Sequence, residues 1–264
     1  MHLPADRGLR LTGYWIDPTP RPGWENMALD HAMFDLAEET GALIWRLYRW
    51  APWCLSFGRH EPASRRYDRA RLAALGIDCV RRPTGGRAVW HARELTYAVA
   101  GPTERLGSLR AAYLAIHELF AGAVRELGLA ATLAPKRTTP GLGDGACFAV
   151  PVGGELVVGG KKLLGSAQRR GLRALLQHGS LLLEDDQALV RSVQLTGGEV
   201  GVAETTVSAL LGRRLEFEEA VAAVRRALQA AGVPPLPAEG PNEVLRRAQT
   251  HYDTYRSEAN TWER

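Results

Sequence analysis

Two segments of the chain contain residue types that could do chemistry. The first, residues 81–91, reads RRPTGGRAVWH, and the second, residues 160–168, reads GKKLLGSAQ. A Gly-Gly turn flanked by arginines lets backbone N–H groups approach a polar or anionic ligand without a Cβ in the way. A lysine beside a Gly-Ser-Ala run supplies a positive charge for a carbonyl or phosphoryl oxygen. Because Cys147 lies between the two segments, acyl transfer is the leading interpretation of this combination.

The Gly85-Gly86 turn has an alternative interpretation as a simple hairpin turn, at about even odds when the two glycines are considered alone. Three arginines, Arg81, Arg82 and Arg87, crowd around it. Their mutual repulsion is easier to understand if a polar or anionic ligand binds there. We therefore expect this turn to bind a substrate.

The lysine pair follows a second turn, Gly159-Gly160. It is not a phosphate-binding P-loop, because that motif needs a hydroxyl residue directly after the lysine, and Lys161 is followed by Lys162. A hairpin turn predicts that the two lysines point to opposite faces of the next strand, one inward and one toward solvent. The alternative, two surface lysines, is disfavoured by the Gly165-Ser166-Ala167 run beyond.

The cysteines differ in their surroundings. Cys54 and Cys79 fall in apolar segments, and we assign both to the core. Cys147 follows the glycine-rich residues 141–145 and lies 15 residues before Lys162. A nearby ammonium would favour its thiolate, although a lone cysteine is more commonly a small buried hydrophobe.

His91 and His178 each lie at the end of a predicted strand. A structural histidine, with both ring nitrogens hydrogen-bonded inside the protein, is the commoner alternative to a binding role. No His-Glu-x-x-His motif or paired ligand spacing is present. We therefore predict no metal site.

Composition limits the class of protein. The 264 residues are 45% hydrophobic and 23% charged, as expected of one sizeable globular domain. No run of about 18 apolar residues predicts a membrane span, and the first residues lack the apolar stretch of a secretory signal, so we expect a cytoplasmic protein. The net charge of +4 is mild. It fits an acidic protein partner or an anionic substrate at least as well as nucleic acid, which we do not expect to bind.

Hydrophobic periodicity and turn residues place the elements that must position these groups. We expect helices over residues 26–40, 63–75, 108–127, 216–231 and 242–256. We expect strands over residues 43–49, 53–57, 77–82, 88–90, 95–100, 155–158, 161–164, 173–177 and 180–183. This order lacks regular βαβα alternation and predicts an α+β fold with mixed or antiparallel sheets and flanking helices. Residues 1–210 would form the catalytic domain, and residues 211–264 a helical C-terminal extension.

The chain resembles the catalytic domains shared by lipoate-protein ligases, octanoyltransferases and biotin-protein ligases. The resemblance covers about residues 10–230 and is carried by residues 26–30, 81–91, 94–97, 160–170 and 177–182. It implies a fold related to the core of class II aminoacyl-tRNA synthetases. It also implies that Lys162 contacts the acyl carbonyl. The substrate-binding residues implied by the matching motifs are Arg81, Arg82, Thr84, Gly85, Gly86, His91, Gly165, Ser166, Ala167, His178 and Gly179.

The branch of the family that the chain most resembles carries its acyl group on the cysteine of a Cys-Phe-x-x-Pro motif. Residues 147–151 match this motif, so the resemblance implies that Cys147 is the nucleophile. One departure is that an aromatic residue is expected between the proline and Glu155, where this chain has Val152-Gly153-Gly154. This departure affects the expected shape of the pocket wall at residues 152–154.

The resemblance implies transfer of octanoate from octanoyl-acyl carrier protein to the lysine of a lipoyl-domain protein, with no cofactor. The expected acceptor is the H protein of glycine cleavage or the E2 protein of a 2-oxoacid dehydrogenase. A basic surface around Arg81, Arg87, Arg169 and Arg170 would dock these acidic partners, and we expect a monomer. The alternatives are an ATP-dependent lipoate ligase, a lipoyl amidotransferase acting between lipoyl-domain proteins, and a binding module without catalysis.

Overall fold

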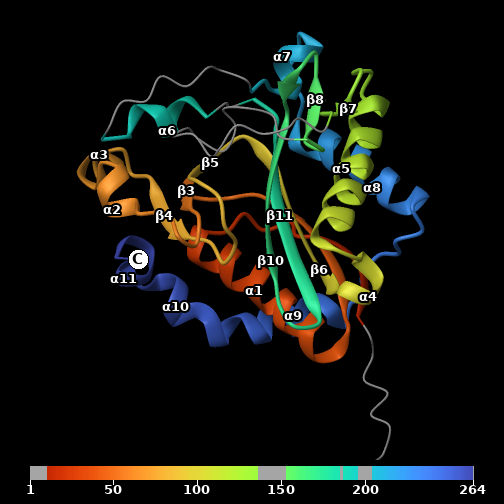
Figure 1. Cartoon of the computed structure of the whole chain (residues 1–264), viewed down its shortest axis with the longest axis horizontal. Coiled ribbons are helices and arrows are strands. Elements are labelled where there is room, and N and C mark those ends of the chain that lie inside the picture. Colours follow the sequence, from red (N-terminus) through yellow and green to blue (C-terminus); the bar gives the residue numbers. More distant parts are fainter. Residues whose placement is uncertain (1–10, 136–152, 185–186, 196–203, 264) are drawn as a thin grey trace, which may run out of the picture.

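The computed structural model describes residues 11–135, 153–184, 187–195 and 204–263, which form an α+β fold (Figure 1). Its largest sheet has the strand order β1-β2-β6-β11-β10. The first two strands are parallel and the other pairs are antiparallel. These strands are β1 (Thr12–Ile16), β2 (Leu43–Tyr48), β6 (Glu94–Pro102), β10 (Leu164–Arg170) and β11 (Ala174–Leu182).

Both faces of this sheet are covered. Successive side chains of a strand point to opposite faces, and in β2 Trp45 and Leu47 join one hydrophobic cluster while Ile44 and Tyr48 join another. Helices α5 (Leu109–Glu126) and α8 (Phe217–Ala230) pack on the first face, and α1 (Gly23–Thr40) packs on the second. All six residues of β2 are therefore buried, and both of its faces lie in the core.

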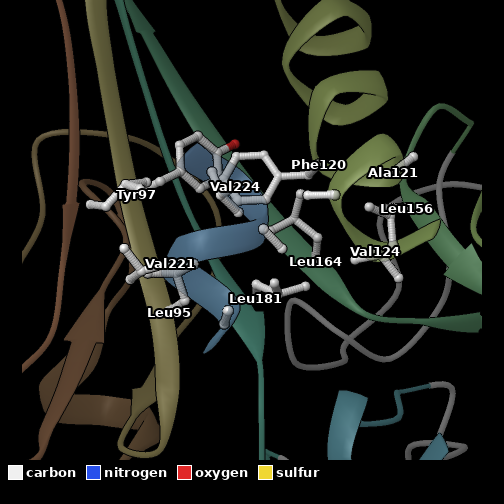
Figure 2. Packing of buried hydrophobic residues seen from close by; sticks show 14 of the residues in the cluster. Leu95, Tyr97, Phe120, Ala121, Val124, Leu156, Leu164, Leu181, Val221 and Val224 are labelled. Atoms are coloured by element: carbon white, nitrogen blue, oxygen red, sulfur yellow. The ribbon is translucent and has the colours of Figure 1, made fainter. Parts of the chain in front are cut away.

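The first cluster is the larger core (Figure 2). Leu95 and Tyr97 from β6 meet Phe120 and Val124 from α5. Val224 of α8 packs into the same cluster. Burying such side chains contributes about 1.5–3 kcal/mol each, and this packing anchors the strands that carry the site.

A smaller sheet lies beside the large one, in the order β4-β3-β5. It consists of β3 (Cys54–Phe57), β4 (Asp78–Arg81) and β5 (Val89–His91). Helices α2 (Ala63–Arg66), α3 (Arg69–Ala74) and α6 (Ala188–Ser192) surround a third hydrophobic cluster on this sheet. The Gly85-Gly86 turn joins β4 to β5.

The predicted hairpin around Gly159-Gly160 is confirmed. Strands β8 (Leu156–Val158) and β9 (Lys161–Lys162) pair in antiparallel register, with Val157 opposite Lys162, and β7 (Thr132–Leu133) completes this third sheet. Lys161 is exposed and Lys162 is buried, as the alternation of side chains along a strand requires.

Several expected elements differ from the structure. The helix expected over residues 242–256 is interrupted by a 3₁₀ turn at residues 249–251, and the strand expected over residues 161–164 is divided between β9 and β10. The helix predicted over residues 63–75 is two helices, because Tyr67 is extended and stacks on Phe57, while Asp68 caps α3 by accepting a hydrogen bond from the Arg71 N–H. The two strands predicted over residues 173–183 are the single strand β11. Gly179 lets β11 continue beside β10, because a Cβ there would lie 2.3 Å from the Gly165 carbonyl oxygen.

The C-terminal helices wrap around the rest of the molecule (Figure 1). Beyond α7 (Val207–Leu211) and α8, the chain forms α9 (Glu239–Ala248), a 3₁₀ turn η1 (Gln249–His251), α10 (Tyr252–Arg256) and α11 (Glu258–Trp262). Val244 and Ala248 pack in the cluster under α1, and Trp262 packs in the cluster of the small sheet. The division at residue 210 stays a prediction; residues on both of its sides share the same hydrophobic clusters.

Two short elements complete the described chain. Helix α4 (Thr103–Leu106) leads from β6 to α5, whose N-terminus is capped by Ser108, since the Ser108 hydroxyl accepts a hydrogen bond from the Ala111 N–H. In the described ranges, we find no helix with the length and apolar character needed to cross a membrane.

Candidate active site

A cavity lies where the three sheets meet, and its empty space, together with the open solvent at its mouth, is about 540 Å³. The large sheet contributes β2, β6, β10 and β11, the small sheet contributes β3 and β5, and the hairpin sheet contributes β9. The lining residues are Met27, Tyr48, Trp50, Ser56, Arg82, Val89, His91, Thr96, Glu155, Lys162, Gly165, Ser166, Ala167, His178, Gly179 and Ser180. The two segments that the sequence singled out therefore line the same cavity.

Lys162 forms the charged wall of this cavity. Its ammonium is only 2% exposed and donates a hydrogen bond to Glu155 Oε1 over 2.5 Å. Glu155 is equally buried, at 3%. Removing one partner of such a buried pair lowers the free energy of unfolding by about 3–5 kcal/mol. Glu155 therefore stabilises the charge of Lys162 at a position that is shielded from water.

Arg82 organises the Gly85-Gly86 turn and also lines the cavity. Its guanidinium donates to the carbonyl oxygens of Gly85 and Arg87, and to the carbonyl and hydroxyl oxygens of Ser56. The turn also packs tightly against Gly58, where a Cβ would lie 1.8 Å from the Gly86 carbonyl oxygen. The turn is thus held on both sides by β3 and the residues that follow it.

Arg81 does something different from what the sequence predicted. It is 2% exposed, and its guanidinium donates to backbone carbonyl oxygens on two distant segments. One segment is the loop of Gly58, Arg59 and Glu61, and the other is Asn260 and Thr261 in α11. The expectation that Arg81 belongs to an exposed docking surface is wrong, because its charge is used to fasten α11 to the small sheet.

His178 is one of two histidines that face the cavity. Its Nδ1–H donates to Asp30 Oδ2 over 2.8 Å, and its Nε2 lies 2.6 Å from the Thr84 hydroxyl. Burial lowers the pKa of His178, so the imidazole is neutral. Asp30 in turn pairs with the fully buried Arg46. These contacts connect Thr84, which precedes the Gly85-Gly86 turn, with the buried Arg46–Asp30 ion pair.

His91 is the second histidine that faces the cavity. Its Nδ1 lies 2.7 Å from Glu94 Oε1, and its Nε2 lies 2.8 Å from the Ser56 hydroxyl. The ring also stacks on Trp50, with 4.1 Å between centroids. Both histidines therefore have both ring nitrogens hydrogen-bonded inside the protein, as the structural alternative expected, and both also line the cavity.

Ser166 belongs to a third polar chain. Its hydroxyl lies 2.7 Å from the Tyr97 hydroxyl and 2.8 Å from His117 Nε2, and Gln177 donates to Tyr97. Burial, reinforced by the charge of Lys162, lowers the pKa of His117 to about 3. A neutral imidazole beside Ser166 keeps this wall of the cavity free of a second positive charge.

The cysteines within the described residues are poor nucleophiles. Burial raises the pKa of Cys54 well above its usual range and that of Cys79 to about 12, so both thiols are protonated at neutral pH. Cys54 is fully buried in the core, as expected, and Cys79 is half-buried against the third cluster. Cys147 lies outside the described residues.

Within the parts of the chain that the structure describes, one group of side chains offers the donor atoms of a metal site. His31 and Asp35 of α1 lie close to His251. However, Arg169 donates to His31 Nε2 over 2.8 Å, and the Tyr255 hydroxyl lies 3.0 Å from His31 Nδ1. The rings of His31 and His251 are also stacked, at 10°. Parallel rings do not direct their lone pairs to one point, so this cluster joins the C-terminal helices to α1 and does not suit a cation.

The predicted substrate-binding residues divide into two groups. Arg82, His91, Gly165, Ser166, Ala167, His178 and Gly179 line the cavity, as does Lys162, whereas Arg81, Thr84, Gly85 and Gly86 are not among its lining residues in the described chain. Their contacts with a substrate stay predictions. Sequence reasoning missed Ser56, Trp50 and Glu155, which lie in no Gly-rich motif. For Glu155, the hint was its position seven residues before Lys162, at the other end of the same hairpin.

The chain was compared with known protein families and curated sequences. The family model of the lipoyl protein ligase A/B catalytic domain matches residues 22–229. An octanoyltransferase LipM of Carboxydothermus hydrogenoformans is 37% identical over 179 residues, which span 66% of each chain. A protein of the same name from Symbiobacterium thermophilum is 36% identical over 222 residues, 78% of this chain and 81% of that one. The alignments thus span from just under two thirds to four fifths of these relatives' lengths.

Solved structures show the same fold at lower identity. A lipoate-protein ligase A bound with ATP superposes with a TM-score of 0.78 at 21% identity, covering 95% of this chain and 99% of that one. A bipartite lipoate protein ligase from Thermoplasma acidophilum gives a TM-score of 0.75 at 19% identity, covering 95% and 96%. The expected α+β architecture is confirmed.

Proposed function

The chain belongs to the lipoyl protein ligase A/B catalytic domain family, and we propose that it is an acyltransferase that moves an octanoyl group in protein lipoylation. Its curated relatives at 36–37% identity are octanoyltransferases, which supports this member of the family over the ligases. The donor would be octanoyl-acyl carrier protein. The acceptor would be the lysine of a lipoyl-domain protein, with the glycine cleavage H protein or a 2-oxoacid dehydrogenase E2 as the candidates.

The observation that carries the proposal is the buried Lys162 ammonium on the wall of a cavity with many apolar atoms. An acyl chain needs an apolar space, which Met27, Trp50 and Val89 help to supply. Its carbonyl oxygen needs a cation where charge develops, and the Lys162–Glu155 pair places one there. A preorganised charge of this kind stabilises the transition state of acyl transfer.

The proposed nucleophile is Cys147. The other two thiols are protonated at neutral pH and do not line the cavity as the described residues form it. In the proposed mechanism, the Cys147 thiolate attacks the thioester carbonyl and the carrier's thiolate leaves. The acceptor amine then displaces Cys147, forming the amide. Thioester exchange is nearly isoenergetic, so the reaction needs no ATP and no cofactor.

The proposed docking surface for the acidic partners is the exposed Arg170 together with Arg87 and Arg169, which are half-buried. Attraction between an exposed basic surface and an acidic protein raises the association rate and weakens with salt. We expect kcat/KM for the carrier protein to fall as ionic strength rises from about 10 to 150 mM, with little change in kcat. A kcat/KM that is independent of salt would contradict docking at these arginines.

The function is tested by mixing the purified protein with octanoyl-acyl carrier protein and an unmodified lipoyl-domain acceptor, without ATP. Octanoylation of the acceptor lysine, read by intact mass, is the expected result. Modification that appears only with free acid and ATP would instead identify a ligase. Modification only from an already octanoylated H protein to E2 would identify an amidotransferase, and no modification in any of these mixtures would favour a binding module.

A further inference from the structure

Thr84, His178 and Asp30 form a buried series of hydrogen bonds that joins three parts of the fold. The Thr84 hydroxyl lies 2.6 Å from His178 Nε2, and His178 Nδ1 lies 2.8 Å from Asp30 Oδ2. Thr84 belongs to the segment that joins β4 to β5, His178 to β11 and Asp30 to α1. The series therefore connects the turn of the small sheet with the large sheet and with the helix that packs on it.

The carboxylate of Asp30 sets the direction of these hydrogen bonds. A carboxylate only accepts hydrogen bonds, and Asp30 also accepts from Arg46 and Tyr48. The proton of His178 is therefore on Nδ1, where it is donated to Asp30. Burial lowers the pKa of His178, so the imidazole is neutral and its Nε2 accepts. Thr84 then donates its hydroxyl proton to His178.

The residues beside His178 in the large sheet are small. His178 lies opposite Ala167 of β10 and opposite Ala98 of β6, and residues that are directly paired share one face of a sheet. Because both neighbours are alanines, the imidazole is the side chain that extends from this part of the sheet to Thr84.

The cavity lies between the two walls that the Thr84–His178 hydrogen bond joins. Arg82 and Val89, on either side of the turn, line the cavity, and residues 178–180 of β11 line it as well. Thr84 itself is only 1% exposed and is not among the lining residues of the described chain. Its hydroxyl is therefore placed to set the distance between these walls, and not to contact a ligand.

Other contacts of the turn come from its own sheet. Arg82 donates to carbonyl oxygens of the turn, and the Arg59 N–H donates to the Thr84 carbonyl oxygen over 2.8 Å. These contacts hold the shape of the turn, whereas the hydrogen bond from the Thr84 hydroxyl to His178 holds the turn against β11.

We propose that Asp30 and His178 are positioning residues, which act through the Thr84 hydroxyl to hold the Gly85-Gly86 turn at the distance from β11 that the acyl donor requires. The part that concerns the donor rests on the proposed function. The family resemblance implies that Thr84 contacts the substrate, whereas in this inference Thr84 acts through His178. Without the hydroxyl, a buried imidazole nitrogen loses its donor, and the turn is free to move away from the sheet.

Hydrogen exchange of the backbone amides of residues 85–87 measures how often the turn opens. One hydrogen bond changes such an opening equilibrium about fivefold, so exchange in Thr84→Val should be about fivefold faster than in the parent. Thr84→Ser keeps the hydroxyl and should exchange at the parent rate. Thr103→Val is the matched control, because it removes a threonine hydroxyl of α4 that donates to the Arg173 carbonyl oxygen, and it should leave residues 85–87 unchanged. Parent-like exchange in α5 shows that each variant is folded.

Steady-state kinetics of octanoyl transfer test the effect on the donor. In Thr84→Val, part of the donor's binding energy is spent on closing the turn, so KM should rise by up to about fivefold. The value of kcat should stay at that of the parent, because Lys162 is untouched, and Thr84→Ser should keep the parent KM.

A double-mutant cycle separates positioning from direct contact with the donor. If Thr84 acts only through His178, adding Thr84→Val to His178→Leu should not raise KM further. A rise as large as that in the parent background would show that Thr84 contacts the donor itself, and the positioning role would be refuted.

The exchange measurement needs no activity, so this inference and the proposed function fail separately. If the parent transfers no octanoate, the proposed function is wrong, while exchange at residues 85–87 still decides whether the turn is held. If Thr84→Val exchanges these amides at the parent rate, the hydrogen bond does not hold the turn and the inference is wrong. Amides of the parent that exchange as fast as those of an unstructured peptide would overturn it as well.

Discussion

Replacing Arg81 with lysine tests whether this residue supports the fold or binds substrate. Its guanidinium donates to five carbonyl oxygens on two segments, the loop of Gly58, Arg59 and Glu61 on one side and Asn260 and Thr261 on the other. A lysine keeps the charge, but its donors radiate from one nitrogen and cannot span both segments. We therefore expect Arg81→Lys to lose about three of these hydrogen bonds.

The expected cost follows from the number of lost contacts. A hydrogen bond contributes about 1 kcal/mol net, so three should lower the free energy of unfolding by about 3 kcal/mol. With an unfolding entropy of about 2.1 cal/mol/K per residue, a chain of 264 residues should lose about 5 °C in Tm. Calorimetry and urea unfolding measure both quantities.

Activity measured well below the Tm completes this test. Because Arg81 lies outside the cavity, kcat and KM of Arg81→Lys for octanoyl transfer should equal those of the parent at low temperature. The matched variant is Arg82→Lys, whose guanidinium lines the cavity and holds the Gly85-Gly86 turn, and this variant should lose activity. If Arg81→Lys were as stable as the parent but had a raised KM, Arg81 would bind substrate and the structural role would be refuted.

Four further predictions follow from the same contacts. Cys147→Ser should form no octanoyl adduct in the intact-mass assay, whereas Cys54→Ser and Cys79→Ser should keep it; an adduct on Cys147→Ser would move the nucleophile elsewhere. Lys162→Met should lower the free energy of unfolding by about 3–5 kcal/mol because it leaves Glu155 charged and buried. The double variant Lys162→Met/Glu155→Leu should regain stability but not activity, and recovered activity would show that the charge is dispensable. His117 has a folded pKa of about 3 against about 6.5 when unfolded, so the unfolded state binds more protons between these values. Stability should be full above pH 6.5 and should fall by about 2 kcal/mol from pH 7 to pH 5 through this residue; His117→Gln should flatten that slope in urea unfolding, and an unchanged slope would contradict the assignment. Gly58→Ala should cost about 1–3 kcal/mol and impair transfer, because its Cβ would strike the Gly86 carbonyl oxygen. Gly122→Ala in α5, where a Cβ meets nothing within 4 Å, is its control and should be neutral or stabilising by up to about 1 kcal/mol.

Local patterns in the sequence determined the burial of one lysine in the hairpin and the family resemblance. The side chains of a strand alternate between its faces, so the Gly159-Gly160 turn was enough to predict that one of Lys161 and Lys162 is buried, and the structure buries Lys162. The Gly-Ser-Ala run and the residues around His178 carried the family resemblance, which the family model confirms over residues 22–229. These features depend on neighbours in the chain, and a sequence displays such neighbours directly.

Only the tertiary structure decided which charges face the cavity. Arg81 and Arg82 are adjacent and chemically identical, yet one fastens α11 and the other lines the site. Arg81 donates hydrogen bonds to the carbonyl oxygens of residues 260 and 261, which lie 179 and 180 positions further along the chain. Likewise, Ser56 meets His91 because β3 pairs with β5. A sequence shows which groups are present, whereas their partners follow from how separate strands and helices pack together.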